Sequence, residues 1–321
     1  MHTAMQTLAV VLEAPEALSL QYLPLDRAGE KDLLVQVHFS GISTGTERLL
    51  WNGRMPPFPG LGYPLVPGYE SVGTVLSADA STGFRAGDAV FVPGARCFGE
   101  VKGLFGGAAS HLVTAADRVV RLPKPLADTA DGEQGVLLAL AATAWHAITV
   151  AGPGLPDLVI GHGVLGRLVA RMVVALGGQP TVWERQAGRC GAPGAYPVIT
   201  AEQDTRHDYR RIVDVSGDDQ ILDQLILRLA KGGTVVLAGF YSGRLSFGFP
   251  PAFMREASLR VAAEWAPADL QAVLDLVGAG RLSLEDLITH REVAVRAPSA
   301  YRTAFNDPLC LKMILDWRDA A

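Results

Sequence analysis

Three glycines have the spacing of a turn that binds dinucleotides. Gly161, Gly163 and Gly166 form G-x-G-x-x-G in "VIGHGVLGRL", between a short apolar run and an amphipathic stretch. The first glycine permits a tight turn, the second lets the backbone approach a pyrophosphate, and the third lets a helix pack closely on a strand. Free N–H groups at the start of that helix would complete a phosphate site. Predicted dinucleotide contacts are therefore Gly161, His162, Gly163, Val164, Leu165 and Gly166; the alternative is a turn with fortuitous glycines.

An acidic residue lies at the distance expected for recognition of an adenosine ribose. Glu184 follows Gly166 by 18 residues, at the end of the next predicted strand. A carboxylate there accepts hydrogen bonds from ribose hydroxyls and repels a 2′-phosphate, so NAD is the predicted cofactor. Arg185 and Arg189 are close enough in sequence to meet a phosphate, which leaves NADP open. His162, inside the turn, is expected either to touch the pyrophosphate or to point to solvent.

Strands and helices alternate in the middle of the chain. The segments 157–178, 211–217 and 232–240, together with "PTVWER", predict four strands joined through helices. This alternation is typical of a doubly wound parallel sheet with the Rossmann arrangement. We therefore predict a dinucleotide-binding domain over residues 129–264, with Ser216 and Gly239 as further cofactor contacts after its third and fourth strands.

The N-terminal part of the chain has a different pattern. Residues 33–41 alternate apolar and polar side chains, which is typical of a half-buried strand, and similar short strands follow at close spacing. The sequence therefore predicts an α/β protein in which a β-rich domain covers residues 1–128. Residues 265–321 contain no glycine-rich turn of their own and are expected to return to that first domain.

A second candidate for chemistry is "LVPGYESVGTVL", which places Tyr69 beside Glu70 between two glycines. The two side chains could form a catalytic pair. In a regular strand, however, neighbouring side chains point to opposite faces. The pattern therefore argues against a side-by-side acid/base pair, and it does not say which of the two side chains faces a reaction site.

Composition and charge exclude several classes of protein. The formal net charge is −5 without a basic run, which argues against a nucleic-acid partner. No stretch approaches the roughly 18 apolar residues of a membrane span. Cys97, Cys190 and Cys310 are far apart and form neither a disulfide framework nor a metal motif. With no secretory signal in the N-terminal sequence, a cytoplasmic location is expected.

Several segments resemble the medium-chain dehydrogenase/reductase superfamily. The resemblance runs nearly from end to end and is carried by "SGISTGTE", "VPGYESVGTV", "GGAASHLVT", "AATAWHAI", "GGTVVLAG" and "LKMIL". It implies a GroES-like catalytic domain, a Rossmann domain and an alcohol dehydrogenase or reductase activity.

The departures from that superfamily concern its zinc ligands. Zinc-dependent members have a cysteine at Ser43, a histidine at Tyr69 and a cysteine near Ala139, so that only Glu70 is retained. Neutral hydroxyls are poor substitutes for thiolate and imidazole ligands. The resemblance therefore implies a member without metal.

Without zinc, a side chain must take the proton of an alcohol. The resemblance places Tyr69 over the nicotinamide, which makes it the first candidate, with Glu70 behind it as support; the alternative is a tyrosine that shapes the pocket. Thr44 and Thr46 correspond to hydroxyls that bind a nicotinamide ribose, although they could equally cap a local turn.

Glu47 is expected to be solvated or to start a helix, with a second acid at the site as the alternative. By resemblance only, Lys312 would reach the cofactor pyrophosphate and Thr143 would pack near the nicotinamide.

Three longer segments resemble the dehydrogenases of bacteriochlorophyll synthesis: residues 41–73, "GHGVLGRL" and "GFYSGRLSFGFPPAFMRE". This resemblance implies NAD-dependent oxidation of the ring-A hydroxyethyl group of a bacteriochlorophyllide, a tetrapyrrole, to acetyl. Apolar side chains on two loops could bind the flat macrocycle or could seal the core; they are Trp51, Met55, Phe58 and Phe240.

Two other functions are left open: an NADPH-dependent, zinc-free quinone or enone reductase, and a dinucleotide-binding protein without catalysis. A homodimer and a loose membrane association also stay open.

Overall fold

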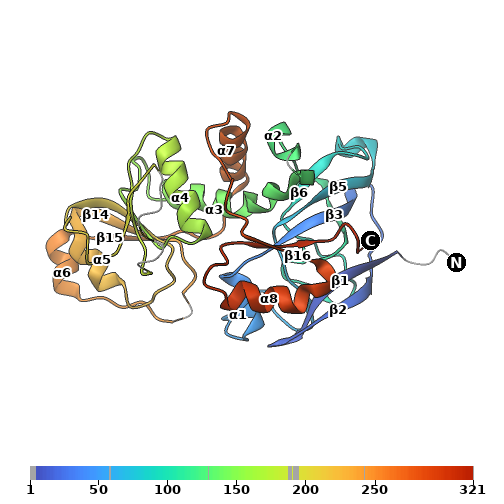
Figure 1. The fold of residues 1–321 in the computed structure, drawn as a ribbon, viewed down its shortest axis with the longest axis horizontal. Coiled ribbons are helices and arrows are strands. Elements are labelled where there is room, and N and C mark those ends of the chain that lie inside the picture. The colour runs from blue at the N-terminus through green and yellow to red at the C-terminus, as the bar shows by residue number, and fades with distance from the viewer. Residues whose placement is uncertain are drawn as a thin grey trace. The chain divides into compact units, whose positions relative to one another are not determined.

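The computed structural model describes residues 5–57, 59–128, 130–186, 190, 195–241 and 243–320. The chain forms two compact units, one made of Met1–Ala139 with Leu284–Ala321 and the other of Leu140–Ser283 (Figure 1). None of the helices in the described part of the chain is long and apolar enough to cross a bilayer.

The first unit is rich in strands, as predicted. Its elements are β1 (Gln6–Ala14), β2 (Ala17–Pro24), β3 (Asp32–Ile42), α1 (Thr46–Trp51), β4 (Leu65–Val66), β5 (Ser71–Ala78), β6 (Ala89–Val92), β7 (Lys102–Gly103), β8 (His111–Ala115), β9 (Val120–Arg121), α2 (Lys124–Ala127), the 3-10 helix η3 (Ala130–Leu137), β16 (His290–Val293), α8 (Ala297–Asn306) and β17 (Met313–Asp316). Four strands form one sheet, in the order β2-β1-β4-β7, and seven form the other.

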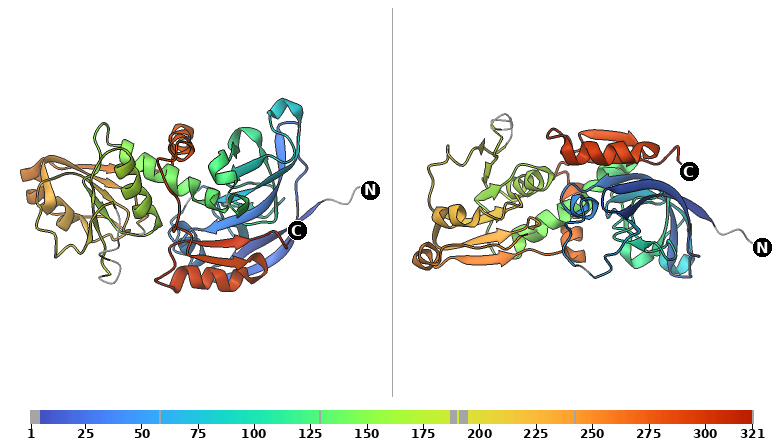
Figure 2. Two further views of the ribbon diagram at one scale, coloured as in Figure 1. Left: turned by 45° about the horizontal axis from the view of Figure 1, so that its top comes forward. Right: turned by 90° about the horizontal axis from the view of Figure 1, so that it is seen from below.

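Strand β3 organises the larger sheet. Its alternating side chains are buried at Leu33, Val35 and Val37, which confirms the strand predicted for this segment. It pairs with β5, β8 and β17, so the C-terminal strand lies directly beside it (Figure 2). The fully buried Trp317 adds a hydrogen bond of 2.8 Å from its indole Nε1 to Oγ of Ser40 in β3. The chain therefore returns to the first domain, as predicted, by pairing β17 with that domain's central strand, β3.

The second unit contains the predicted parallel sheet. Its elements are α3 (Leu138–Thr149), β10 (Leu158–Ile160), α4 (Val164–Ala175), β11 (Thr181–Trp183), β12 (Val198–Ile199), β13 (Tyr209–Asp214), α5 (Leu222–Arg228), β14 (Leu229–Leu237), α6 (Phe249–Arg255), β15 (Ser258–Val261) and α7 (Pro267–Gly278). The strand order is β12-β11-β10-β13-β14-β15, and all five pairings are parallel. Numbered within the unit this is 3-2-1-4-5-6, the order of dinucleotide-binding sheets.

The return to the first unit begins later than residue 265. Helix α7 belongs to the second unit, where Asp269 Oδ2 lies 3.0 Å from Nδ1 of His146 in α3. Just after α7, Arg281 donates to the carbonyl of Ala175 at the end of α4, at 2.8 Å. These contacts explain why the second unit ends at residue 283 rather than at 264; it begins at residue 140 rather than at 129.

A buried arginine closes one end of the second unit. Arg211 in β13 is largely buried, and its guanidinium donates to carbonyl oxygens in the turn after α3. Its acceptors are Ala151, Gly152, Pro153 and Gly154. The carbonyls at a helix C-terminus and in the turn after it lack helical partners, so one cation satisfies several at once.

We expect the substitution Arg211→Leu to lower the free energy of unfolding by about 3 kcal/mol, because it leaves several carbonyls without a donor. Chemical denaturation measures the loss, and hydrogen exchange should locate it in β10, β13 and the turn after α3. The neighbouring exposed Arg210 provides the control, since Arg210→Leu should change stability by less than about 0.5 kcal/mol. Equal effects of the two variants would contradict this role.

Candidate functional site

The glycine turn has the geometry that the motif requires. Gly161 adopts the left-handed conformation (φ 95°), and its N–H donates to the carbonyl of Trp183 at 2.9 Å. Nothing lies within 4 Å of the position of a Cβ on Gly163, which leaves open space beside the start of α4. A Cβ on Gly166 would lie 1.8 Å from the carbonyl oxygen of Gly161, so only glycine lets helix and turn approach so closely. The turn therefore has the open backbone at Gly163 that close approach of a pyrophosphate requires.

Other predicted cofactor residues meet at this edge of the sheet. A Cβ on Gly161 would lie 3.4 Å from Cα of Ser216, which follows β13. Gly239, which follows β14, donates its N–H to the carbonyl of Asp214 at 3.0 Å. The structure thus brings the ends of β10, β13 and β14 together, as expected for a parallel sheet that binds its ligand there.

His162 does not point to solvent, so that alternative is wrong. Its side chain is buried, with Nε2 3.3 Å from the Tyr196 hydroxyl and the two rings in edge contact. Val164 and Leu165 begin α4, as predicted.

Glu184 directly follows β11 and is mostly buried. Its Oε1 accepts the N–H of Gln186 at 2.8 Å, which fixes the carboxylate at the end of the strand. Arg185 is exposed, whereas Arg189 lies outside the described residues. Thr143 is half-buried in α3. Contacts of these residues with a cofactor stay predictions.

In the first unit, the structure brings the predicted hydroxyls of Tyr69 and Thr46 together with that of Ser43. The Tyr69 hydroxyl donates to Ser43 Oγ at 2.5 Å and is hydrogen-bonded to Thr46 at the start of α1. The Tyr69 ring also makes an edge contact with Phe105, with centroids 5.3 Å apart. Thr44 lies next to Ser43 in the same turn and is half-buried.

The surroundings of Tyr69 do not favour a phenolate. Desolvation, followed by the nearby charge of Glu70, raises the pKa of the Tyr69 hydroxyl well above its ordinary value of 10. The hydrogen bonds of Tyr69 with Ser43 and Thr46 lower this pKa, but they do not offset the rise. Tyr69 is therefore a neutral hydrogen-bonding group in this structure.

Glu70 and Lys312 form a buried ion pair. Both side chains are at most 1% exposed, and Lys312 Nζ contacts Glu70 Oε2. Burial raises the pKa of Glu70, and the Lys312 ammonium opposes that rise. Tyr69 and Glu70 precede β5, which begins only at Ser71, so they lie in the connection after β4 rather than within a regular strand.

The ion pair changes the expectation for Lys312. Its ammonium is bonded to Glu70, whereas the family resemblance implied a contact between Lys312 and the cofactor pyrophosphate. An ammonium has three N–H donors, so a phosphate contact would have to share the cation with Glu70. That contact stays a prediction.

Glu47 starts a helix, which was one of the two expectations for it, but it is not solvated. It lies in the first turn of α1, is 1% exposed, and accepts the N–H of Ser43 at 3.0 Å. Its other oxygen accepts the hydroxyl of the fully buried Tyr301, in α8, at 2.7 Å. Burial raises the pKa of Glu47 from 4.5 to about 7, against the opposing effect of these two hydrogen bonds. No sequence signal pointed to Tyr301, because it joins Glu47 from 254 residues away.

The predicted substrate residues are divided between core and surface. Trp51 and Met55 pack partly buried against the core of the first unit, which favours the sealing role for both. Phe240 is 46% exposed, and Phe58 lies outside the described residues. Contact of any of these residues with a substrate stays a prediction.

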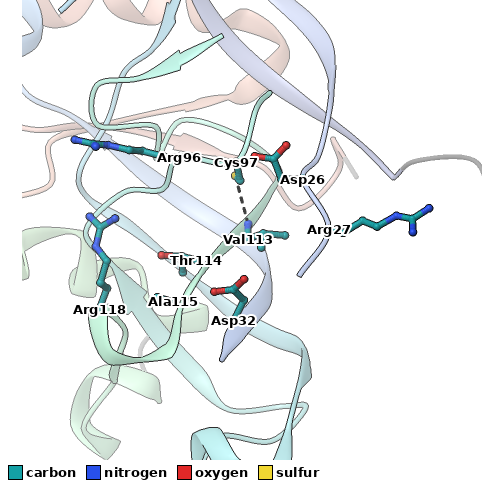
Figure 3. A pocket seen from close by; sticks show the side chains of 9 residues that line it. All are labelled: Asp26, Arg27, Asp32, Arg96, Cys97, Val113, Thr114, Ala115 and Arg118. Carbon is teal, nitrogen blue, oxygen red and sulfur yellow. Dashed lines mark hydrogen bonds between the residues drawn. The ribbon is translucent and has the colours of Figure 1, made fainter. Parts of the chain in front are cut away.

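A pocket of about 240 Å³ lies elsewhere in the first unit (Figure 3). Charged residues dominate its walls: Asp26, Arg27, Asp32, Arg96 and Arg118. It includes none of the predicted site residues and offers little apolar surface for a pigment. The candidate reaction site is therefore the cluster of three hydroxyls on Ser43, Thr46 and Tyr69.

Within the described residues, no group of three His, Cys, Asp or Glu side chains could hold a metal ion. The positions that carry zinc ligands in the superfamily's metalloenzymes, Ser43 and Tyr69, are instead hydrogen-bonded to each other. The zinc-free character of the protein stays a prediction.

Comparison with known proteins defines the family. The model of the alcohol dehydrogenase GroES-like domain matches residues 29–124. L-idonate 5-dehydrogenase from Escherichia coli has the same fold, with a TM-score of 0.84 at 18% identity over 98% of this chain and 99% of that one.

Two curated relatives are much more similar in sequence. The 2-desacetyl-2-hydroxyethyl bacteriochlorophyllide A dehydrogenase of Rhodobacter capsulatus is 57% identical over 98% of this chain and 100% of its own length. The protein of the same name from Cereibacter sphaeroides is 54% identical over 99% of this chain and 100% of its own length. This chain therefore belongs to the same family as these two dehydrogenases, within the medium-chain dehydrogenase/reductase superfamily. Its fold is that of a dinucleotide-binding dehydrogenase.

The buried Glu47 gives a prediction for stability. Its pKa is higher in the folded chain than in the unfolded chain, so the folded state loses stability as pH rises from about 4.5 to about 7. Glu47→Gln removes this loss and keeps an acceptor for Ser43 and a donor for Tyr301. We expect the variant to gain stability relative to the wild type as pH rises from 5 to 8, by on the order of 3 kcal/mol. Denaturation at several pH values measures it, and a difference that does not vary with pH would contradict the burial effect.

Proposed function

We propose that this protein is an NAD-linked dehydrogenase of bacteriochlorophyll synthesis. It oxidises the ring-A hydroxyethyl group of a bacteriochlorophyllide to acetyl, without zinc, in the cytoplasm. The observation that carries this proposal is the 57% identity with the Rhodobacter capsulatus enzyme over nearly the full length of both chains. The oligomeric state is left open.

The second unit supports dinucleotide binding, and Glu184 supports NAD. The open space at Gly163 and the start of α4 suit a pyrophosphate, while Glu184 at the end of β11 suits a ribose with free hydroxyls. When bound, the nicotinamide supplies the hydride acceptor. The turn residues hold and orient the cofactor.

The first unit supports a route for the hydroxyl proton. We assign Ser43 and Tyr69 to the hydrogen bonds that hold the substrate hydroxyl. Thr46, and Thr44 beside it, are partly exposed and continue the chain of hydroxyls along which the proton of the alcohol passes to solvent water. Tyr69 acts as a neutral phenol, because its raised pKa disfavours a free phenolate. The residue types support zinc-free chemistry, since Ser43 and Tyr69 offer only neutral hydroxyls at the ligand positions.

The proposal predicts a spectral change that can be measured directly. Purified protein incubated with NAD and a 3-(1-hydroxyethyl) bacteriochlorophyllide should shift the pigment absorbance to the red, because the acetyl carbonyl conjugates with the macrocycle. NADH should form in equal amount, and metal analysis should find far less than one zinc per chain.

Other outcomes would identify the alternatives. Reduction of quinones or enones with NADPH, without pigment turnover, would show the reductase. Cofactor binding with no turnover in either assay would show a protein without catalysis. About one tightly bound zinc per chain would overturn the zinc-free assignment.

The hydrogen-bonded hydroxyls of Ser43 and Tyr69 are called the hydroxyl pair below, and Tyr69→Phe tests their role. Loss of one preorganised hydrogen-bonding group at a reacting oxygen should lower kcat by about 100-fold, with little change in NAD affinity. Tyr22→Phe is the control, because Tyr22 is 68% exposed on β2 and should leave kcat unchanged. Wild-type turnover in Tyr69→Phe would remove Tyr69 from the reaction.

A further inference from the structure

Glu47 is a buried acid that the reaction described above does not use. Its carboxylate joins the turn at Ser43 to helix α8 through Tyr301. The other ionisable groups that act on it are the Glu70 carboxylate, which raises its pKa, and the Lys312 ammonium, which lowers it. Tyr69 is close enough for the charge of Glu47 to raise the pKa of its hydroxyl.

The charges in this cluster do not balance. Two buried carboxylates, Glu47 and Glu70, share the neighbourhood of one buried ammonium, and Lys312 is bonded to Glu70. In the part of the chain that the structure describes, Glu47 has hydrogen-bond donors but forms no ion pair. An uncompensated buried carboxylate takes up a proton more readily than an exposed one. Glu47, which is not bonded to the ammonium, is therefore the acid of this pair that takes up a proton more readily.

The hydrogen bonds of Glu47 accommodate both charge states. When it is ionised, it accepts from Ser43 N–H and from the Tyr301 hydroxyl. When it is protonated, it donates to the Tyr301 oxygen, because a hydroxyl serves as donor or acceptor. A proton can thus be gained or lost without breaking the 2.7 Å contact.

The change of charge reaches the hydroxyl pair through Ser43. Its backbone N–H is bonded to Glu47, and its Oγ accepts the hydroxyl of Tyr69. A negative charge on Glu47 increases the proton affinity of nearby oxygens, as its effect on Tyr69 shows. Oxygens with higher proton affinity accept a hydrogen bond from an alcohol more strongly.

We propose that Glu47 is a positioning residue that acts through Ser43 and Tyr69: its ionised form makes this hydroxyl pair competent for alcohol oxidation, and its protonated form switches the pair off. The proposal rests on the function proposed above for the same site. It adds a pH switch built from Glu47 and Tyr301.

The pH dependence of kcat tests the switch. For pigment oxidation, wild-type kcat should fall by about tenfold per pH unit below a midpoint near 7. Glu47→Gln imitates the protonated form, because its amide accepts from Ser43 N–H and donates to Tyr301. Its kcat should therefore be low and independent of pH between about 5.5 and 8.5, close to the wild-type rate at the acidic end.

Tyr301→Phe and a surface variant complete the design. The Tyr301 hydroxyl stabilises ionised Glu47, so its removal should move the midpoint to higher pH. Glu30→Gln, on an exposed loop of the first unit, should keep the wild-type profile. If kcat of the Glu47→Gln variant falls at acidic pH as it does in the wild type, the proposal is overturned.

A measurement without turnover separates this proposal from the proposed function. The nuclear magnetic resonance signal of Tyr69, assigned with Tyr69→Phe, should titrate near pH 7 in the wild type and stay constant in Glu47→Gln. If the pigment is not oxidised but this titration is found, the proposed function fails and the coupling of Glu47 to Tyr69 stands. If the pigment is oxidised but the Tyr69 signal does not titrate, the switch is refuted and the function stands.

Discussion

The ion pair between Glu70 and Lys312 is the constraint on which the first unit's site depends. Charges removed from water are costly unless they are paired closely, and this pair is almost fully buried. Its space exists because residue 41 of β3 is glycine: a Cβ there would lie 2.6 Å from Glu70 Oε2. The pair ties the connection before β5 to the chain before β17. Tyr69, next to Glu70, is thereby held where its hydroxyl meets Ser43.

The candidate site of the second unit is formed by backbone groups, and that of the first unit by side chains. In the second unit, the absence of side chains at Gly163 and Gly166 exposes backbone N–H groups and lets α4 approach its turn. In the first unit, buried ionisable side chains determine the properties of a few hydroxyls, and Glu47 has the most consequential position among them. Backbone recognition suits a cofactor common to many dehydrogenases, whereas a side-chain network can be altered for one reaction.

The features that could be predicted from the sequence are those whose residues lie close together in the chain. The G-x-G-x-x-G turn, the strand at β3 and the alternation of the parallel sheet each follow from patterns within about twenty residues. The sequence did not reveal that Glu47, although it starts a helix as expected, is buried, because its partner Tyr301 lies on α8. Lys312 and Glu70 are 242 positions apart, and no periodicity reveals such a pair. The boundary at 283 was missed for the same reason, since the contacts of α7 are made with helices far back in the chain.

The discontinuity of the first unit has a consequence during synthesis of the chain. Residues 1–139 leave the ribosome before the second unit, whereas β17 and Lys312 follow only after it is complete. Until then β3 lacks one of its neighbouring strands, and Glu70 lacks the cation that permits its burial. The second unit, being continuous, has every strand of its sheet available earlier. The nascent chain thus completes the dinucleotide-binding unit first, and the hydroxyl site closes only after β17 and Lys312 have been made.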